Sequence, residues 1–427
     1  MRRADILITS WEGGGNVPPA LALAERLVAR GHRVRISGQE TMRRRVEATG
    51  AELAAHRTVP DYPRDVVLET IWDQVDAVIN GPRMVDELID DLRADRPDLV
   101  LLDSMHGAGM AAAEAVGVPR MVFAHTTYRR WVSWIGRIID LPASRRAARL
   151  EPVPEARFVE DVLGPMDGVL ALIPASFDDP GPIPAATRYV GPILTRAEAR
   201  AVRRGFDRPA GAQPGGERSV LISFGTTIQR QAEALRPVLR AFADLGRVST
   251  GRGDAPVRGV LTLGGVVRPG LIEAPSTVEV LDLVPHAPIF PTVDAVVCHG
   301  GLSTIMGALA AGRPLVVVPQ GRDQDDNATM VEAAGAGIAL PVDAGPPAIA
   351  AAVRAVLGDP SHRRAAQRFA REIDALGHGR LAIELVEAAV QADSRLGRTG
   401  ERAATSIGAR STASIERPAI VDVAAPG

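Results

Sequence analysis

A turn of small and hydroxyl-bearing residues in the second half of the chain has the composition of an anion-binding site. His299-Gly300-Gly301, Ser303 and Thr304 follow the apolar run Val296–Cys298, which reads as a buried strand, and they precede an apolar helical stretch. Glycines let a backbone approach a ligand closely, and the N–H groups at a helix start attract anions. Ser303 and Thr304 are also residue types that cap helices, and the two roles are compatible. We therefore predict that this turn holds a phosphate or a diphosphate.

The elements that must position this turn alternate between strand-like and helix-like patterns along most of the chain. In the first half we predict strands at Asp5–Thr9, Val34–Ser37, Leu99–Leu102, Val118–Ala124, Val169–Ile173 and Tyr189–Val190. In the second half we predict them at Ser219–Ser223, Gly259–Leu263, Val278–Leu281, Val296–Cys298 and Leu315–Val318, and a further strand closes the stretch that ends at Leu340. Strands that alternate with helices indicate an α/β fold with parallel, doubly wound sheets. Ligands bind such sheets outside the carboxyl ends of the strands, so two facing domains would hold the ligand in an interdomain cleft.

Length and composition set the domain boundaries that we expect. A chain of 427 residues favours two domains, which we place at residues 1–200 and 219–375. The segment Thr195–Arg218 is charged and rich in Gly and Pro, so we predict a disorder-prone loop there, with the interdomain linker at residues 201–218. A helical pattern continues to about Val390, and we expect residues 376–392 to form the last helix. The polar tail at residues 393–427 is expected to be disordered.

The order of residues around the glycine turn resembles the donor-binding signature of GT-B glycosyltransferases. The resemblance is to the UDP/TDP-glycosyltransferase family, glycosyltransferase family 1, which includes bacterial natural-product enzymes. The matching elements are His299-Gly300-Gly301, Ser303, Thr304, Gly312-Arg313-Pro314, Pro319, Asp323-Gln324, Asn327-Ala328 and Gly335-Ala336-Gly337. The resemblance implies a GT-B fold of two Rossmann-like domains, the N-terminal one binding the acceptor and the C-terminal one binding the nucleotide-sugar donor. It also implies that the last helix crosses back to the first domain.

The same resemblance implies roles for individual donor-side residues. The turn that begins at His299 would contact the donor diphosphate, and Asp323 with Gln324 would bind sugar hydroxyl groups, which suits side chains that accept and donate hydrogen bonds. The loop Ser223-Phe224-Gly225-Thr226-Thr227 would lie near the diphosphate, and Val284-Pro285-His286 would meet the nucleobase. The alternative for Asp323 and Gln324 is a solvated helix start, where acidic residues favour the helix dipole.

Asp323-Gln324-Asp325 also spells an Asp-x-Asp motif, which binds a divalent metal in the other large glycosyltransferase fold. The surrounding signature contains no matching cluster of His or carboxylate residues. We therefore expect turnover without a metal, and no cofactor apart from the nucleotide-diphosphate sugar that serves as donor substrate.

The position at which family members carry their catalytic base holds an asparagine, Asn16. An amide has no useful basicity near neutral pH, so Asn16 cannot take a proton from an acceptor. We favour Asp103 as the base, because it ends a predicted strand at the carboxyl edge of the first sheet; the family uses this Asp to orient a histidine, and here we expect no histidine partner. Glu12, His106 and His125 are the alternative bases, because they lie on the same loop or near neighbouring strand ends.

The asparagine at position 16 is also compatible with two alternatives to a substitute base. The acceptor could need little activation, as an acidic phenol, a carboxylate, an amine or an electron-rich carbon would. Alternatively, the protein has lost catalysis and acts as a noncatalytic nucleotide-sugar-binding helper of GT-B fold. A GT-B nucleotide-sugar epimerase is less consistent with the pair Asp323-Gln324.

Our leading prediction is an inverting glycosyltransferase. It would move a sugar from a TDP- or UDP-sugar to a small lipophilic acceptor of polyketide, macrolide or aromatic type. Large apolar side chains gather in the first half of the chain, where the family builds its acceptor pocket. They are Tyr62, Trp72, Met84, Tyr128, Trp131 and Trp134, each of which could equally belong to the core.

Charge and composition limit the partners and the compartment. The net charge of −2 argues against nucleic acid or an anionic membrane as partner. The single cysteine, Cys298, excludes an internal disulfide and fits a reducing compartment. The apolar stretch Ile6–Ile8 is too short for a signal peptide, and no run is long enough to span a membrane. We expect a cytoplasmic monomer or homodimer.

Overall fold

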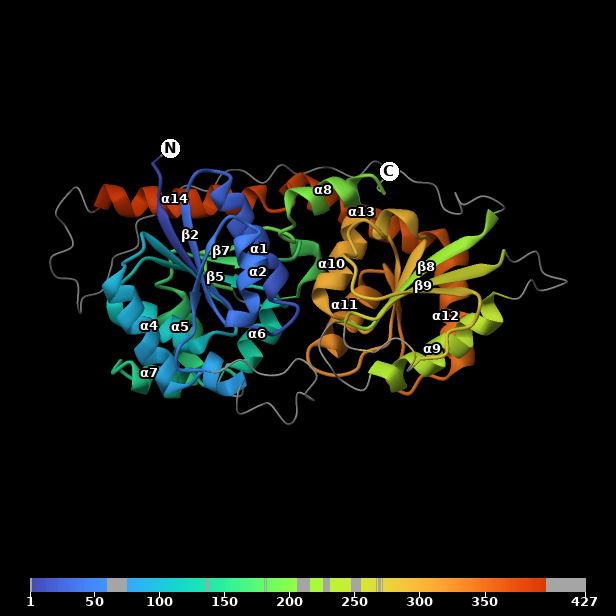
Figure 1. Cartoon of the computed structure of the whole chain (residues 1–427), viewed down its shortest axis with the longest axis horizontal. Coiled ribbons are helices and arrows are strands. Elements are labelled where there is room, and N and C mark those ends of the chain that lie inside the picture. The colour runs from blue at the N-terminus through green and yellow to red at the C-terminus, as the bar shows by residue number, and fades with distance from the viewer. Residues whose placement is uncertain are drawn as a thin grey trace. The chain divides into compact units, whose positions relative to one another are not determined.

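The computed structural model contains two parallel sheets flanked by helices, one built from each half of the chain (Figure 1). The residues that it describes are 2–59, 75–135, 138–179, 181, 183–205, 216–225, 231–246, 255–265, 267, 270 and 272–396. The predicted disorder of the tail concerns residues that lie almost entirely outside these ranges.

The first sheet is built from strands of the N-terminal half. Across the described ranges its order is β3 (Glu52–Ala55), β2 (Arg33–Gly38), β1 (Asp5–Thr9), β4 (Leu99–Asp103), β5 (Arg120–Ala124), β6 (Gly168–Ala171) and β7 (Thr187–Tyr189), with parallel pairing throughout. The strand order reverses between β1 and β4, which is where ligands bind in doubly wound sheets. The loops that follow these two strands therefore lie at the expected ligand-binding edge.

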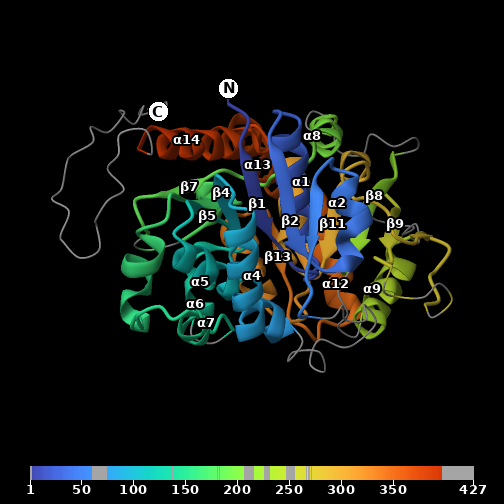
Figure 2. The same ribbon diagram turned by 60° about the vertical axis from the view of Figure 1, so that its left-hand side comes forward.

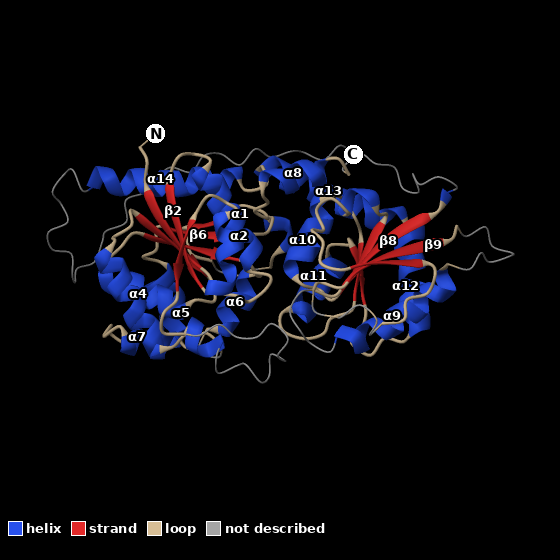
Figure 3. Ribbon diagram, viewed as in Figure 1, coloured by secondary structure: helices blue, strands red, loops and turns tan. Residues whose placement is uncertain are grey.

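Helices cover both faces of the first sheet (Figure 3). They are α1 (Val17–Val28), α2 (Arg43–Glu47), α4 (Pro82–Ala94), α5 (Gly107–Val116), α6 (Tyr128–Trp134), α7 (Leu141–Ala147) and the last helix of the described ranges, α14 (Arg380–Leu396). Ala382, Ile383 and Val386 of α14 pack in the same buried cluster as Ile6 and Leu23. In both ribbon views α14 lies on the same side as the N-terminus of the chain (Figures 1 and 2).

The second sheet repeats the architecture with strands of the C-terminal half. Where the structure is described, the order is β10 (Val278–Leu281), β9 (Val257–Thr262), β8 (Arg218–Ser223), β11 (Ala295–Cys298), β12 (Leu315–Val317) and β13 (Gly337–Ala339), again all parallel. The accompanying helices are α9 (Gln231–Leu245), α10 (Leu302–Ala310), α11 (Gln324–Ala333), α12 (Pro346–Gly358) and α13 (Pro360–Leu376). The predicted α/β fold with two doubly wound sheets is confirmed.

Two local predictions differ from the structure. Glu52–Ala55 forms the edge strand β3, which the sequence did not indicate because its exposed and half-buried side chains show no apolar alternation. The predicted loop at Thr195–Arg218 is wrong for its first part, which forms helix α8 (Arg196–Arg203). Thr195 and Glu198 form a reciprocal capping box that starts this helix, and Ala201 with Val202 buries its apolar face.

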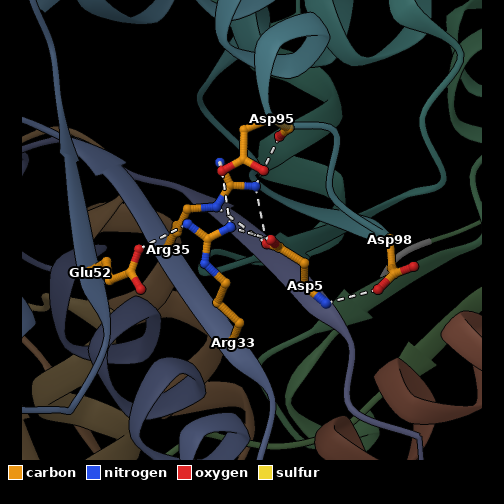
Figure 4. Close-up of polar contacts among 6 residues, drawn as sticks. All are labelled: Asp5, Arg33, Arg35, Glu52, Asp95 and Asp98. Atoms are coloured by element: carbon orange, nitrogen blue, oxygen red, sulfur yellow. Dashed lines mark hydrogen bonds and ion pairs between the residues drawn. The ribbon is translucent and has the colours of Figure 1, made fainter.

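Charged residues at the amino ends of the first sheet's strands form what we call the amino-edge network (Figure 4). Its members are Asp5, Arg33, Arg35, Glu52, Asp95 and Asp98. Arg33 donates to Asp5 Oδ2 at 2.6 Å, to Asp95 Oδ2 at 2.9 Å and to Glu52 Oε2 at 3.1 Å. Arg35 donates to Asp5 Oδ1 at 3.0 Å, and the carboxylate of Asp98 accepts the main-chain N–H of Asp5 at 2.8 Å. The network joins β1, β2 and β3 to the segment before β4.

The helices of the described ranges differ in length or hydropathy from membrane-spanning helices. None of them combines the length and the apolar character needed to cross a bilayer.

Candidate active site

The predicted phosphate-binding turn lies between β11 and α10. Gly300 has a φ of 92°, and a Cβ at this position would stand 3.0 Å from the main-chain oxygen of Gln324, so the turn requires glycine. Gly301 occupies the N-cap position without a side-chain cap. Ser303 and Thr304 lie within the first turn of α10, so the capping role considered for them is wrong. Both residues instead line the cavity described below, at the start of the helix.

His299 is held in this turn as a neutral imidazole. Its Nδ1 lies 3.4 Å from the main-chain oxygen of Ser223, at the end of β8. Glycines surround its Nε2, because a Cβ on Gly225 or Gly301 would stand 2.9 Å or 2.6 Å from that atom. Burial lowers the pKa of His299 to about 4, and the nearby guanidinium of Arg322 contributes in the same direction.

Asp323 and Gln324 lie at the start of α11, at the same edge of the second sheet. Asp323 Oδ2 accepts from Asn327 Nδ2 at 3.0 Å and from Thr126 Oγ1 at 3.4 Å. Gln324 Oε1 accepts the main-chain N–H of Gln320 at 2.7 Å, which leaves its amide nitrogen for a ligand. Both residues lie at a helix start, and both also line the main cavity.

The remaining donor-side predictions lie close by, with one exception. Ser223 Oγ is 3.3 Å from His286 Nε2, and Thr262 Oγ1 is 3.0 Å from the same atom. Val284 and His286 line a second cavity of about 270 Å³ beside the main one, and burial lowers the pKa of His286 to about 4. The exception is the segment Thr226-Thr227, which falls outside the described residues.

The first sheet contributes a buried carboxylate, Asp103, at the carboxyl end of β4. Asp103 has 0% exposure, and its Oδ1 lies 3.0 Å from His125 Nε2 and accepts the N–H of Met105 at 2.8 Å. Its Oδ2 accepts from Asn16 Nδ2 at 2.9 Å. Burial alone would raise the pKa of Asp103, but His125 and these hydrogen bonds lower it overall, so the carboxylate stays ionised. The expectation that Asp103 has no histidine partner is therefore wrong, because His125 on the neighbouring strand end supplies one.

Asn16 lies at the N-cap of α1 but does not cap it. Its side chain turns away from the helix, and Nδ2 donates to Trp11 O at 2.9 Å as well as to Asp103. The amide oxygen Oδ1 is buried and accepts no hydrogen bond from the described part of the chain. Asn16 thus acts on Asp103 rather than on the helix terminus.

The other two candidate bases do not line the main cavity. The carboxylate of Glu12 pairs with Arg45 and accepts from Thr41 Oγ1 at 3.3 Å. His106 caps α5, because its Nδ1 accepts the N–H of Gly109 at 2.9 Å, and burial lowers its pKa to about 4. Structural roles thus account for both side chains.

A cavity of about 320 Å³ collects residues from the carboxyl edges of both sheets. The second sheet lines it with His299, Gly301, Ser303, Thr304, Arg322, Asp323 and Gln324, and the first sheet with Asn16, His125, Trp11, Met105, Trp134 and Ile138. The two sets meet directly, because Ser303 Oγ donates to Gly15 O at 2.9 Å and Arg130 pairs with Asp326. The second sheet therefore lines the cavity mainly with polar side chains and the helix start, and the first sheet contributes most of its large apolar side chains.

Sequence reasoning missed Arg322 and could not separate the aromatic residues. Arg322 has a φ of 62°, unusual for a residue with a Cβ, and it brings a guanidinium to the cavity beside His299. Trp131 is fully buried, with Nε1 donating to Ser104 O at 2.7 Å, whereas Trp134 lines the cavity. Met84 belongs to the core, and Tyr62 and Trp72 fall outside the described ranges.

Sequence comparisons identify relatives along most of the chain. Residues 249–379 match the C-terminal domain of the erythromycin biosynthesis protein CIII-like family. Oleandomycin glycosyltransferase of Streptomyces antibioticus is 30% identical over 421 residues, which cover 91% of this chain and 91% of that protein. The NDP-glycosyltransferase YjiC of Bacillus licheniformis is 27% identical over 406 residues, covering 91% of this chain and 98% of the relative.

Solved structures show the same fold. CalG4, the calicheamicin glycosyltransferase, aligns with a TM-score of 0.68 at 22% identity and covers 94% of this chain and 100% of its own. VinC, a glycosyltransferase solved in complex with dTDP, aligns with a TM-score of 0.63 at 21% identity, covering 91% of this chain and 100% of its own. With the identity and coverage of the oleandomycin enzyme, these findings show that the chain belongs to the bacterial natural-product glycosyltransferases of the GT-B fold and is a transferase enzyme.

Proposed function

We propose that this glycosyltransferase moves a sugar from a TDP- or UDP-sugar to a small hydrophobic natural-product acceptor, with inversion at the anomeric carbon. The observation that carries this proposal is the shared cavity, which is lined by the glycine turn and the start of α10 from the second sheet and by apolar side chains from the first. The relatives support it, because they include an oleandomycin glycosyltransferase and a structure solved in complex with dTDP.

The donor would bind along the second sheet. Its diphosphate meets the first turn of α10, where the helix dipole and the N–H groups stabilise the charge that develops as the bond to the sugar breaks. Arg322 adds a full positive charge at the same place. Asp323 and Gln324 bind sugar hydroxyl groups, and the nucleobase of the donor reaches the second cavity beside Val284.

The protonation of His299 limits what it can do for the diphosphate. A carbonyl oxygen only accepts, so the contact with Ser223 places the proton on Nδ1 and leaves Nε2 of the neutral ring as an acceptor. A phosphate oxygen is also an acceptor. His299 would therefore contact it through Nε2 as an imidazolium, which the negative charge of a bound diphosphate favours.

In this proposal, the positions of the acceptor and of the leaving diphosphate lead to inversion at the anomeric carbon. The acceptor lies against Trp134, Met105 and Ile138 on the first-sheet side, and the leaving diphosphate lies on the second-sheet side. Attack and departure then occur on opposite faces of the sugar in a single displacement. The turn, Arg322 and the helix start supply the positive charge that the leaving group needs, so we propose that turnover requires no metal.

Calorimetry and product analysis test the proposal together. We expect dTDP or UDP to bind in the presence of a chelator, and ADP and GDP to bind much more weakly. Purified protein should then transfer sugar from the matching donor to macrolide, polyketide or aromatic aglycones, and NMR coupling constants should show the opposite anomeric configuration to the donor. Retained configuration, or activity that returns only with Mg²⁺ or Mn²⁺, would contradict the mechanism.

A further inference from the structure

The proposed transfer needs a group that removes the acceptor proton, and Asn16 cannot supply it. We propose that His125 is the catalytic base of this enzyme, with Asp103 and Asn16 as the residues that position it. This inference rests on the proposed function, because it assigns the base within the same cavity.

Strand register places the two members of this pair together. Asp103 is the last residue of β4 and is paired in register with Phe123 of β5, so His125 follows only two residues later at the same edge of the sheet. The contact between Asp103 Oδ1 and His125 Nε2 measures 3.0 Å. An ionised carboxylate only accepts, so the proton of the neutral ring lies on Nε2, and Nδ1 keeps the lone pair.

Exposure separates the roles of the two residues. Asp103 is fully buried and does not line the cavity, whereas the side chain of His125 is 17% exposed and lines both cavities. His125 therefore can reach an acceptor, and Asp103 can act only through His125. The next residue, Thr126, donates directly to Asp323, which places His125 close to the predicted sugar-binding pair.

The charges around His125 favour its protonated form once it has taken a proton. Burial alone would lower the pKa of His125, but the carboxylate of Asp103, its hydrogen bond and the carboxylate of Asp323 raise it overall. The other titratable groups that line the same cavity are His286, His299 and Arg322. His125 is thus stabilised as an imidazolium by Asp103 from β4 and by Asp323 from the start of α11.

Asn16 completes the arrangement as a positioning residue. An N-cap asparagine ordinarily accepts a helix N–H, but this side chain instead gives its amide hydrogens to Asp103 and to Trp11 O. Together with the N–H of Met105, it fixes both oxygens of the Asp103 carboxylate. Because an amide does not compete for the proton, Asp103 is left to orient His125.

The proton and the electron pairs balance in one step. The acceptor O–H bond breaks and its proton moves to Nδ1 of His125, while the acceptor oxygen forms a bond to the anomeric carbon. The bond from that carbon to the phosphate oxygen breaks, and its electron pair leaves with the nucleoside diphosphate. The resulting imidazolium faces the carboxylate of Asp103, which stabilises it.

The test replaces His125 by glutamine, with His106→Gln as the matched control at another buried histidine of the same sheet edge. We expect His125→Gln to lower kcat on an aliphatic alcohol acceptor roughly 10²- to 10⁴-fold, with unchanged affinity for dTDP in calorimetry. His106→Gln should stay within a few-fold of the wild-type kcat. Circular dichroism and the melting temperature verify that each variant is folded.

A second acceptor distinguishes a base from a structural residue. An acidic phenol needs less help with its proton, so His125→Gln should lower kcat on a nitrophenol much less than on the alcohol. Equal losses on both acceptors, or normal turnover of the alcohol by folded His125→Gln, would overturn the assignment of His125. If the wild-type protein transfers no sugar to either acceptor, the proposed function itself fails.

Discussion

The two ends of the first sheet both concentrate charge, but they pair it in different ways. At the amino ends, the network of Asp5, Arg33, Arg35, Glu52, Asp95 and Asp98 matches acids with guanidinium groups (Figure 4). At the carboxyl ends, the carboxylate of Asp103 is held by amides and one histidine. The amino-edge charges satisfy one another and join strands. The carboxyl-edge charge instead leaves one partner, His125, able to exchange a proton with a ligand.

This difference shows how one sheet separates stability from chemistry. Parallel strands bring loops from several parts of the chain to the carboxyl edge, and those loops can change without disturbing the strands. Both cavities described above border this edge, since His125 lines each of them, whereas the ion pairs of the amino edge are partly exposed to water. If this contrast is correct, substitutions at the two ends should alter different properties.

Asp103→Asn should cause the largest loss. An amide cannot stabilise the imidazolium of His125 and can present its N–H to the wrong side of the ring, so we expect kcat to fall roughly 10²- to 10⁴-fold. The protein should remain folded, because a neutral amide is easier to bury than a carboxylate. Steady-state kinetics, with circular dichroism as the folding control, measure this. A kcat close to wild type would mean that Asp103 serves only the structure of the loop.

The pH dependence of turnover should carry the signature of His125. The raised pKa of His125 means that the free base predominates only above the ordinary histidine value of about 6.5. Activity, kcat/KM, should therefore fall roughly tenfold per pH unit as the pH drops below this raised pKa.

The titration of His125 should also affect the stability of the protein, but in the opposite direction to its effect on kcat/KM as the pH rises. The ion pair of protonated His125 with Asp103 contributes fully below the unfolded pKa of about 6.5, and its contribution is lost as the pH rises through the folded pKa. Melting temperatures and kcat/KM measured over one pH series test both signs. An acidic limb that persists in His125→Gln would assign it to another group.

Asn16→Ala should have a smaller effect on turnover. It removes one of the donors to Asp103 but leaves the contact with His125, so we expect kcat to fall about tenfold, equivalent to about 1.4 kcal/mol in the activation free energy. KM for the donor should change little, because Asn16 makes its hydrogen bonds to Trp11 and Asp103. Kinetics on the alcohol acceptor measure the loss. If Asn16→Ala lowers kcat more than Asp103→Asn does, Asn16 contacts the substrate directly.

The residue pattern in the sequence singled out the predicted donor side of the site more clearly than the proposed catalytic base. The turn at His299 and the pair Asp323-Gln324 each follow a predicted strand, so the residue pattern placed both at the carboxyl edge of one sheet, and the family resemblance supplied their expected donor roles. The contact between His125 and Asp103 depends on the pairing of β4 with β5, which residue patterns do not specify. His125 was consequently one of several candidates near strand ends.

Features set by tertiary packing were also beyond the sequence. Trp131 and Trp134 lie three residues apart on α6, and periodicity could not reveal that one is buried while the other lines the cavity. The sequence also could not show that the side chain of Asn16, at the N-cap of α1, donates to Asp103 rather than accepting a helix N–H, because Asp103 comes from a different strand. The fold was predictable because alternating strands and helices are a local pattern, apart from β3 and α8.

Asp5→Asn should leave turnover unchanged and lower stability, which completes the contrast with Asp103→Asn. The carboxylate of Asp5 accepts from both Arg33 and Arg35, and an amide offers only one oxygen and no charge. We expect the free energy of unfolding to fall by about 1.5–3 kcal/mol, the range for hydrogen bonds to charged groups, as measured by denaturant titration. Glu52→Gln is the matched control, because the ion pair of Glu52 with Arg33 is more exposed, so its loss should lower the free energy of unfolding by less. A loss of kcat in folded Asp5→Asn at unchanged stability would show that the two ends of the sheet are coupled, and the separation of stability from chemistry would fail.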